Sequence, residues 1–181
     1  MSKGDVVLLD CWASPFCLRA KVALAEKGVE YEARAENLFG GKSDLLLKSN
    51  PIYKKVPVLL HDGKPVGKIC SLKAYVFDAV CNTWKSKGEV PETAKNEFIE
   101  ILKQLEGALG EKDFFGEDSF GFVDVIAIPL TCWFYAVEKF GGFNVENECP
   151  KFSAWMNKCM QRETVARILP DPEKVTNLLS R

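Results

Sequence analysis

The chain has 181 residues, of which 47% are hydrophobic and 27% charged, and its formal net charge is −1. This composition excludes a disordered tail, and the length fits one domain or two small ones. The near-neutral charge, with lysines scattered along the chain, argues against nucleic acid or an acidic membrane surface as a partner. The N-terminus lacks a signal-peptide pattern, and the longest apolar run, residues 125–137, is too short to cross a bilayer. We therefore expect a cytoplasmic protein.

The seven cysteines are widely spaced without a CxxC pair, and the chain has a single histidine. This pattern provides neither the spacing of zinc ligands nor a disulfide framework. We expect no metal site, and we expect reduced thiols that mostly serve as small buried hydrophobic residues.

Strand and helix patterns alternate in the first half of the chain. Ser14 followed by Pro15 is typical of a helix start, because serine caps the first turn and proline fits the first helical position. Asp62-Gly63 is typical of a hairpin turn. The predicted elements are a strand at 6–9, a helix at 15–27, a strand at 31–35, a helix at 42–49 and a hairpin at 56–66. Their order is βαβαββ.

Helical periodicity dominates from Ser71 onward. Residues 121–137 are apolar nearly all round, which predicts one central buried helix with Asp124 in its first turn, where a carboxylate can accept from unpaired N–H groups. The other predicted helices include apolar faces at 72–84 and 98–109 and two segments at 150–161 and 163–169. We expect an α/β domain over residues 1–72 and an all-α domain over residues 73–181.

The stretches VVLLDCWASPF, KKVPVL and EKDFFGEDSFGFVDV, with others that cover most of both halves, resemble the cytosolic glutathione transferases, and specifically the plant tau class. The resemblance implies a thioredoxin-like N-terminal domain that binds glutathione and a helical C-terminal domain that helps to bind an electrophile. It implies conjugation of glutathione to hydrophobic electrophiles in detoxification and stress response, with glutathione as co-substrate and no cofactor.

Ser14 matches the catalytic serine of this family. The thiol of glutathione has a pKa of roughly 8.5, so little of it is ionised at neutral pH. A hydroxyl that donates to sulfur at a helix N-terminus stabilises the thiolate, because the hydrogen bond and the helix dipole both favour negative charge. The alternative for Ser14 is a plain N-cap.

Cys17 is the rival nucleophile, since S-P-F-C is similar to the C-P-Y-C of glutaredoxins with serine in place of the first cysteine. Cys17 occupies the place of the less reactive, buried cysteine of that pair. The interpretation that we favour is a packing role, with thiol oxidoreductase chemistry as the alternative.

Other residues match positions that bind glutathione in the family. Val56 precedes Pro57, which matches the cis-proline of thioredoxin-like folds, and its backbone N–H and C=O would pair with the cysteinyl unit of glutathione. Lys42 and Lys55 match positions that hold the glycyl carboxylate, although either could be an ordinary surface charge. Ser71 would reach the γ-glutamyl end.

An apolar, aromatic wall suits flat hydrophobic electrophiles. The residues at or near the family positions that line such a wall are Phe16, Phe77, Cys81, Trp84 and Trp155. The alternative for each aromatic side chain is ordinary core packing, and for Trp155 the two interpretations have equal weight.

The family pattern is interrupted after the hairpin. Lys68 stands near the position where tau-class chains carry an acidic residue before the serine, and its ammonium would repel the γ-glutamyl amine of the substrate. A family member would also carry roughly 40 more residues before Tyr75, so the fold is expected to be shortened between its two domains. This leaves open whether the chain forms the homodimer, and whether it is an active transferase or a weak or inactive ligand-binding variant.

Overall fold

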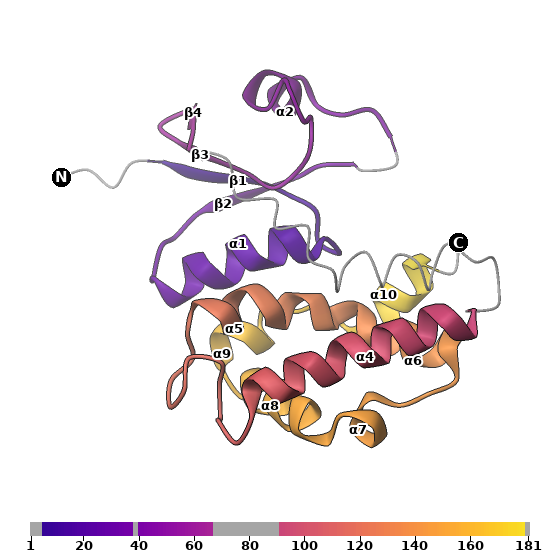
Figure 1. Cartoon of the computed structure of the whole chain (residues 1–181). Coiled ribbons are helices and arrows are strands. Elements are labelled where there is room, and N and C mark those ends of the chain that lie inside the picture. Colours follow the sequence, from indigo (N-terminus) through magenta and orange to yellow (C-terminus); the bar gives the residue numbers. More distant parts are fainter. Residues whose placement is uncertain (1–4, 38–39, 67–90, 180–181) are drawn as a thin grey trace. The chain divides into compact units, whose positions relative to one another are not determined.

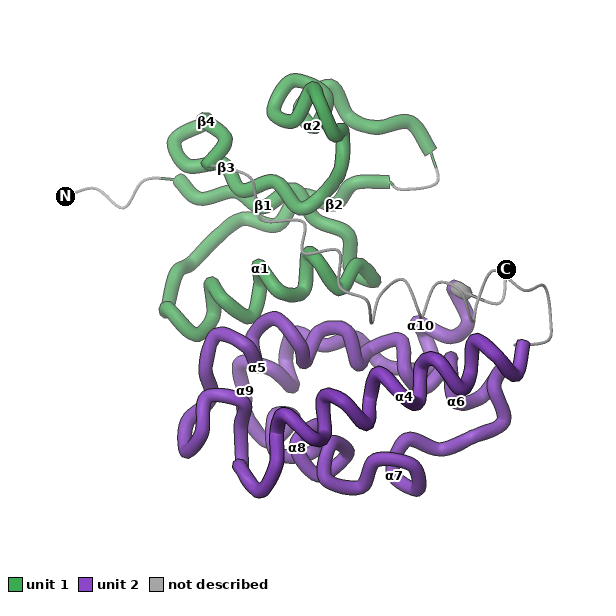
Figure 2. Tube along the Cα trace, viewed as in Figure 1, with its two compact units in different colours: residues 1–72 green, residues 73–181 purple. Residues whose placement is uncertain are grey.

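The computed structural model describes residues 5–37, 40–66 and 91–179. The chain divides into two compact units, Met1–Leu72 and Lys73–Arg181 (Figure 2). The division falls between residues outside those described, so the expected domain limits stay a prediction. The hairpin is described as far as Val66, and the helical face expected at 72–84 lies outside the described residues.

A four-stranded mixed sheet forms the centre of the first unit. Its elements are β1 (Val6–Asp10), α1 (Pro15–Glu26), β2 (Glu32–Ala35), α2 (Asp44–Ser49), β3 (Val58–His61) and β4 (Lys64–Pro65). The strand order is β2-β1-β3-β4, with β2 parallel to β1 and β3 antiparallel to it. This βαβαββ arrangement confirms the thioredoxin-like α/β prediction.

The helices α1 and α2 lie on opposite faces of this sheet (Figure 1). Side chains alternate between the two faces along a strand. On one face, Leu9 of β1 packs with Val58 and Leu60 of β3 and with Leu46 of α2, and all four are buried. The opposite face carries Leu8, which is fully buried.

Asp10, the last residue of β1, is buried and forms an ion pair with Lys21 of α1. The Nζ–Oδ2 distance is 2.5 Å, and the side chains are only 16% and 8% exposed. The second carboxylate oxygen, Oδ1, is buried without a hydrogen-bond partner in the described part of the chain. The charge of Asp10 is therefore compensated mainly by Lys21.

The elements described in the second unit are helices. They are α4 (Glu92–Leu109), α5 (Phe122–Ala127), the 3₁₀ helix η1 (Ile128–Trp133), α6 (Phe134–Gly141), α7 (Val145–Glu148), α8 (Pro150–Met160), α9 (Glu163–Ala166) and α10 (Pro172–Leu179). The all-α prediction is confirmed for these residues. None of the described helices is both long enough and apolar enough to cross a membrane.

The segment predicted as one buried helix over residues 121–137 is divided into α5, η1 and α6. Pro129 lies at the start of η1, and because proline lacks an N–H and its ring crowds the preceding turn, regular α-helical hydrogen bonding stops there. The beginning of the segment is also less buried than expected, since Phe122 is 79% exposed.

Aromatic rings from several helices form the core of this unit. Phe98 of α4 meets Phe134 of α6 edge-on at 5.1 Å between ring centroids. Phe134 stacks on Phe152 of α8 at 6.3 Å, and Phe152 contacts Trp155 at 4.8 Å. Phe115, in the loop after α4, meets Trp155 edge-on at 5.3 Å between ring centroids. This chain of rings joins α4, α6 and α8.

The fully buried carboxylate of Asp124 connects this aromatic core to the start of α5. Its Oδ1 accepts hydrogen bonds from the backbone N–H of Phe115 at 2.9 Å and from Trp155 Nε1 at 2.7 Å. Its Oδ2 accepts from the N–H of Gly121 at 2.8 Å and of Gly116 at 3.3 Å. The first-turn role predicted for Asp124 is confirmed, and the carboxylate also fixes the loop between α4 and α5.

We expect Lys21→Met to destabilise the protein by about 3–5 kcal/mol, because it leaves the Asp10 carboxylate buried and unpaired. Urea unfolding followed by circular dichroism measures the change. In the Lys21→Met variant, a second substitution Asp10→Asn should recover part of the lost stability, because it removes the unpaired charge. The matched control is Lys95→Met, which breaks the Lys95–Glu92 pair on α4, where Glu92 is 72% exposed, and should cost less than about 1 kcal/mol. Equal effects of the two lysine substitutions would contradict this prediction.

Asp124→Ala should destabilise the second unit by roughly 3–5 kcal/mol, since four donors lose their acceptor in a buried site. Trp155→Phe removes one of these donors and should cost less. Denaturant titration of both variants provides the comparison. A loss below about 1 kcal/mol for Asp124→Ala would show that water replaces the carboxylate without penalty.

Candidate active site

The turn between β1 and α1 carries Ser14. The side chain is half-buried and caps α1, because Oγ accepts a hydrogen bond from the backbone N–H of Cys17 at 3.4 Å. The N–H of Ser14 donates to the carbonyl of Cys11 at 3.0 Å, which closes the turn. Pro15 begins the 12-residue helix. The N-cap predicted for Ser14 is confirmed.

The surroundings of Ser14 Oγ favour negative charge. The Oγ atom accepts from the N–H of Cys17, and the hydroxyl also forms a hydrogen bond with the Cys17 side chain. Because a hydroxyl proton can rotate, the Ser14 O–H can turn to donate to a ligand. The first turn of α1, residues 15–18, contains no acidic side chain to offset the positive end of the helix dipole. A hydroxyl donor at a helix N-terminus can stabilise an anion such as a thiolate.

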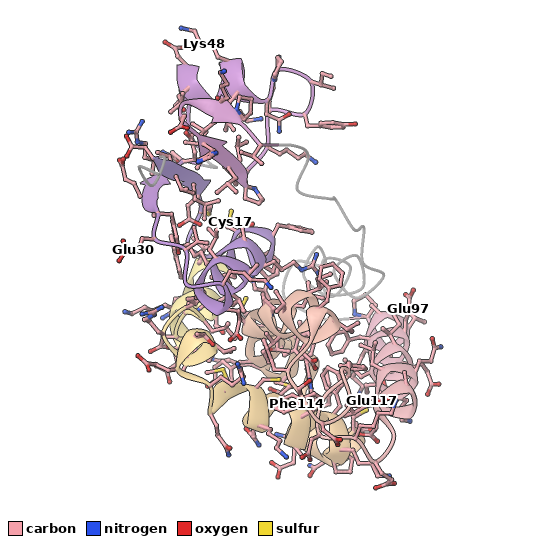
Figure 3. The ribbon with its side chains drawn as sticks, turned by 90° about the vertical axis from the view of Figure 1, so that its left-hand side faces the viewer. Cys17, Glu30, Lys48, Glu97, Phe114 and Glu117 are labelled. Atoms are coloured by element: carbon pink, nitrogen blue, oxygen red, sulfur yellow. The ribbon has the colours of Figure 1, made fainter. Side chains whose placement is uncertain are left out.

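Cys17 lies in the first turn of α1 (Figure 3) and is fully buried. Its Sγ accepts a hydrogen bond from the N–H of Cys11 at 3.3 Å. Burial raises the pKa of the thiol to about 12, although hydrogen bonds with the Ser14 side chain and the Cys11 backbone act to lower it. The thiol therefore stays protonated at neutral pH, which argues against Cys17 as a nucleophile.

Strand register brings the start of β3 to the same edge of the sheet as this turn. The pairing of β1 with β3 ends at Leu9 and Val58, and Val56 precedes β3 at the end of these strands where β1 leads into the turn. The Val56–Pro57 peptide bond is cis. Among the described residues, nothing hydrogen-bonds to the N–H or C=O of Val56. This backbone can pair with an extended ligand placed next to Ser14.

The lysines singled out in the sequence lie on either side of α2. Lys42 precedes the helix and Lys55 follows it, and both side chains are exposed. Neither forms an ion pair with another described residue. The backbone at Lys55 is held by Asn50, whose Nδ2 donates to the Lys55 carbonyl at 3.0 Å. Exposed lysines without an ion-pair partner among the described residues are suited to a carboxylate ligand.

The aromatic candidates differ in their surroundings. Phe16 is half-buried in the first turn of α1, with the guanidinium of Arg19 5.2 Å from its ring centroid. Trp155 is only 2% exposed, and its indole N–H is bound to Asp124, which favours the packing interpretation. The remaining predicted site residues, Lys68, Ser71, Phe77, Cys81 and Trp84, lie outside the described residues, and their roles stay predictions.

Two features of this region were not predicted from the sequence. Trp12, in the turn beside Ser14, is 46% exposed and presents an indole to solvent. The Asp10–Lys21 pair is the second feature. A signal for the pair exists in the sequence, since Lys21 lies one turn after Cys17 on the buried side of α1, where a lysine needs a partner.

Within the described ranges, no cluster of three or more His, Cys, Asp or Glu side chains could hold a metal ion. The cysteines described there, Cys11, Cys17, Cys132, Cys149 and Cys159, are all buried free thiols.

Comparison with known proteins identifies the family. The glutathione S-transferase N-terminal domain matches residues 4–67 and the C-terminal domain matches residues 68–163. Glutathione S-transferase U19 of Arabidopsis thaliana is 45% identical, with 98% of this chain and 95% of the relative covered. A rice glutathione transferase solved in complex with glutathione is 39% identical, with 97% and 96% covered and a TM-score of 0.87. A tau-class enzyme from mango is 29% identical, with 98% of each chain covered and the same TM-score.

The Arabidopsis relative also differs from this chain in length. The alignment runs over 209 residues, about 30 more than the part of this 181-residue chain that it covers. Because both chains are covered nearly from end to end, these positions are absent from the interior, and they are fewer than the roughly 40 expected. Their place after the hairpin stays a prediction. The two domain matches and the near-complete coverage leave no doubt about ancestry: the chain belongs to the glutathione S-transferase family, within its plant tau class.

Proposed function

We propose that this protein conjugates the thiol of glutathione to hydrophobic electrophiles and that Ser14 stabilises the attacking thiolate. The observation that supports this most directly is the position of the Ser14 hydroxyl at the N-terminus of α1, where Oγ accepts from the N–H of Cys17 and the hydroxyl proton can rotate toward a ligand. Glutathione is the co-substrate, and we propose no resident cofactor. The cytoplasm, where thiols stay reduced, is the proposed compartment.

The reaction begins with ionisation of the glutathione thiol, whose proton passes to water. Ser14 donates its hydroxyl hydrogen bond to the sulfur anion, and the dipole of α1 adds to this stabilisation. The thiolate attacks the electrophilic carbon, forming a sulfur–carbon bond as the leaving group departs with its electron pair. Both effects raise the fraction of thiolate at neutral pH, which is the form that attacks.

Binding of glutathione uses the edge of the sheet next to Ser14. The backbone of Val56 pairs with the cysteinyl unit, and Lys42 and Lys55 attract the glycyl carboxylate. Ser71 contributes at the γ-glutamyl end. Phe16, with Phe77, Cys81, Trp84 and Trp155, completes the proposed set for the electrophile, and Trp155 has the weakest claim because it is buried against Asp124.

The alternative is a glutathione-family protein that binds ligands with little or no catalysis. The observation in its favour is the deficit of about 30 internal residues relative to the Arabidopsis protein. Retention on immobilised glutathione together with turnover of 1-chloro-2,4-dinitrobenzene would support the enzyme. Binding of hydrophobic dyes without either property would support the alternative. The absent residues could also remove part of the proposed homodimer interface. Sedimentation analysis tests this by measuring the mass of the protein in solution.

Ser14→Ala should lower kcat/KM for 1-chloro-2,4-dinitrobenzene by roughly 10- to 1,000-fold, the scale of losing one donor to a developing anion. Loss of the cap should cost only about 1 kcal/mol of stability. Steady-state kinetics and thermal unfolding measure the two effects.

The matched control is Asn144→Ala, which removes the side-chain cap of α7, where Asn144 Oδ1 accepts from the N–H of Asn147 at 3.2 Å. This variant should lose a comparable cap and keep its activity. Unchanged turnover in Ser14→Ala would remove Ser14 from the mechanism.

Lys55→Ala and Lys42→Ala should each weaken glutathione binding by about 3- to 10-fold at low salt, and by less at high salt, because each removes an exposed cation from the carboxylate. Calorimetry with glutathione and with its glycyl ethyl ester separates this contact from others, since the ester lacks the charge. The control is Lys48→Ala, an exposed lysine on α2 (Figure 3). The same loss for glutathione and for the ester would contradict the assignment.

A further inference from the structure

We propose that Cys17 is a positioning residue, whose buried sulfur fixes the turn that carries Ser14 and thereby sets the strength of the Ser14 hydrogen bond to the substrate thiolate. This inference rests on the function proposed for Ser14. It assigns to Cys17 neither the nucleophilic role considered from the sequence nor simple space filling.

Three hydrogen bonds close the turn into a ring through Cys17. The N–H of Cys11 donates to Cys17 Sγ at 3.3 Å, the N–H of Ser14 donates to the Cys11 carbonyl at 3.0 Å, and the N–H of Cys17 donates to Ser14 Oγ at 3.4 Å. Cys17 thus holds the first residue of the turn with its side chain and the last residue with its backbone. Loss of either contact frees the turn to shift relative to α1.

The contact between Cys17 and Ser14 polarises the serine hydroxyl. A hydroxyl oxygen that accepts a hydrogen bond becomes a better donor through its own proton, because hydrogen bonds in a chain strengthen one another. At 3.4 Å this bond is longer than the usual N–H···O distance, so a small movement of the turn can strengthen it or break it. A small displacement of Ser14 away from α1 would weaken its donation to sulfur.

Burial keeps Cys17 suited to this role. Sγ is fully buried, and the pKa of the thiol is raised to about 12, so the group remains a neutral acceptor throughout the working pH range. An ionised thiol here would place negative charge close to the proposed glutathione thiolate and oppose its formation. Removal of Sγ would leave the N–H of buried Cys11 without its acceptor, a cost that favours movement of the turn.

The experiment measures the pKa of the thiol of enzyme-bound glutathione by titrating its ultraviolet thiolate absorbance. Cys17→Ala should raise this pKa by about 0.5 to 1 unit, the shift that corresponds to losing much of one neutral hydrogen bond. Cys17→Ser restores an acceptor and should return the pKa to within about 0.3 unit of wild type. The control is Cys132→Ala, which removes a buried thiol of similar pKa, about 12, from η1. It should leave the bound pKa unchanged.

A double variant tests whether Cys17 acts through Ser14. Ser14→Ala/Cys17→Ala should have the same bound pKa as Ser14→Ala alone, since the effect of Cys17 is already lost with the hydroxyl. Additive shifts would overturn the inference. It would also be overturned if Cys17→Ala lowered activity by one factor at every pH without moving the bound pKa, the behaviour of a residue that only maintains the fold.

Failure of this inference can be told apart from failure of the proposed function. If Ser14→Ala leaves the bound pKa unchanged, the role of Ser14 itself is wrong. If Ser14→Ala raises it and Cys17→Ala does not, only the role of Cys17 is wrong. Should Cys17→Ala fail to fold, Cys17→Val fills the same space without an acceptor and takes its place in each comparison, with the same expected shift.

Discussion

The unpaired N–H groups at the start of a helix are the constraint on which both units depend. The two units satisfy it with opposite chemistry. At α1, the neutral hydroxyl of Ser14 accepts from one N–H and keeps a proton to donate. At α5, the fully buried carboxylate of Asp124 accepts from the N–H of the N-cap residue Gly121 and from three donors outside the helix. The Ser14 hydroxyl can still donate a hydrogen bond to a substrate. The Asp124 carboxylate already accepts four hydrogen bonds and stabilises the fold.

The buried ion pair between Asp10 and Lys21 affects how well the start of α1 can stabilise a thiolate. Asp10 ends β1 immediately before the turn, and an uncompensated carboxylate there would oppose formation of a thiolate near Ser14. Lys21 supplies the opposite charge at 2.5 Å from within α1. One helix therefore provides the cap geometry through Ser14, the anchor through Cys17 and the neutralising cation through Lys21. The electrostatics around Ser14 are thus determined largely by α1, the turn before it and Asp10 at the end of β1.

Local signals in the sequence were sufficient to predict most helices and strands of the first unit and the helix caps formed by Ser14 and Asp124. The period of the apolar residues, the Ser14-Pro15 pair and the Asp62-Gly63 turn each predict an element that the structure contains. The division at Pro129 was missed because the apolar pattern continues through the 3₁₀ turn. The short helices α7 and α10 were also missed, although Asn144 and Pro172 stand at their starts. The Asp10–Lys21 pair and the anchoring of Cys11 by Cys17 depend on tertiary contacts that periodicity does not encode.

The deficit of about 30 residues relative to the Arabidopsis protein affects the steps of the proposed reaction unequally. Every contact that positions Ser14 comes from residues 11–17, and the strand register that places Val56 involves only β1 and β3. These contacts are short-range or belong to one sheet, so they form without the absent segment. Recognition of the γ-glutamyl end has no such support, because Lys68 and Ser71 follow the hairpin where the family pattern is interrupted. We therefore expect the chain to retain the means to stabilise a thiolate, and to differ from full-length tau-class proteins mainly in how tightly it holds glutathione.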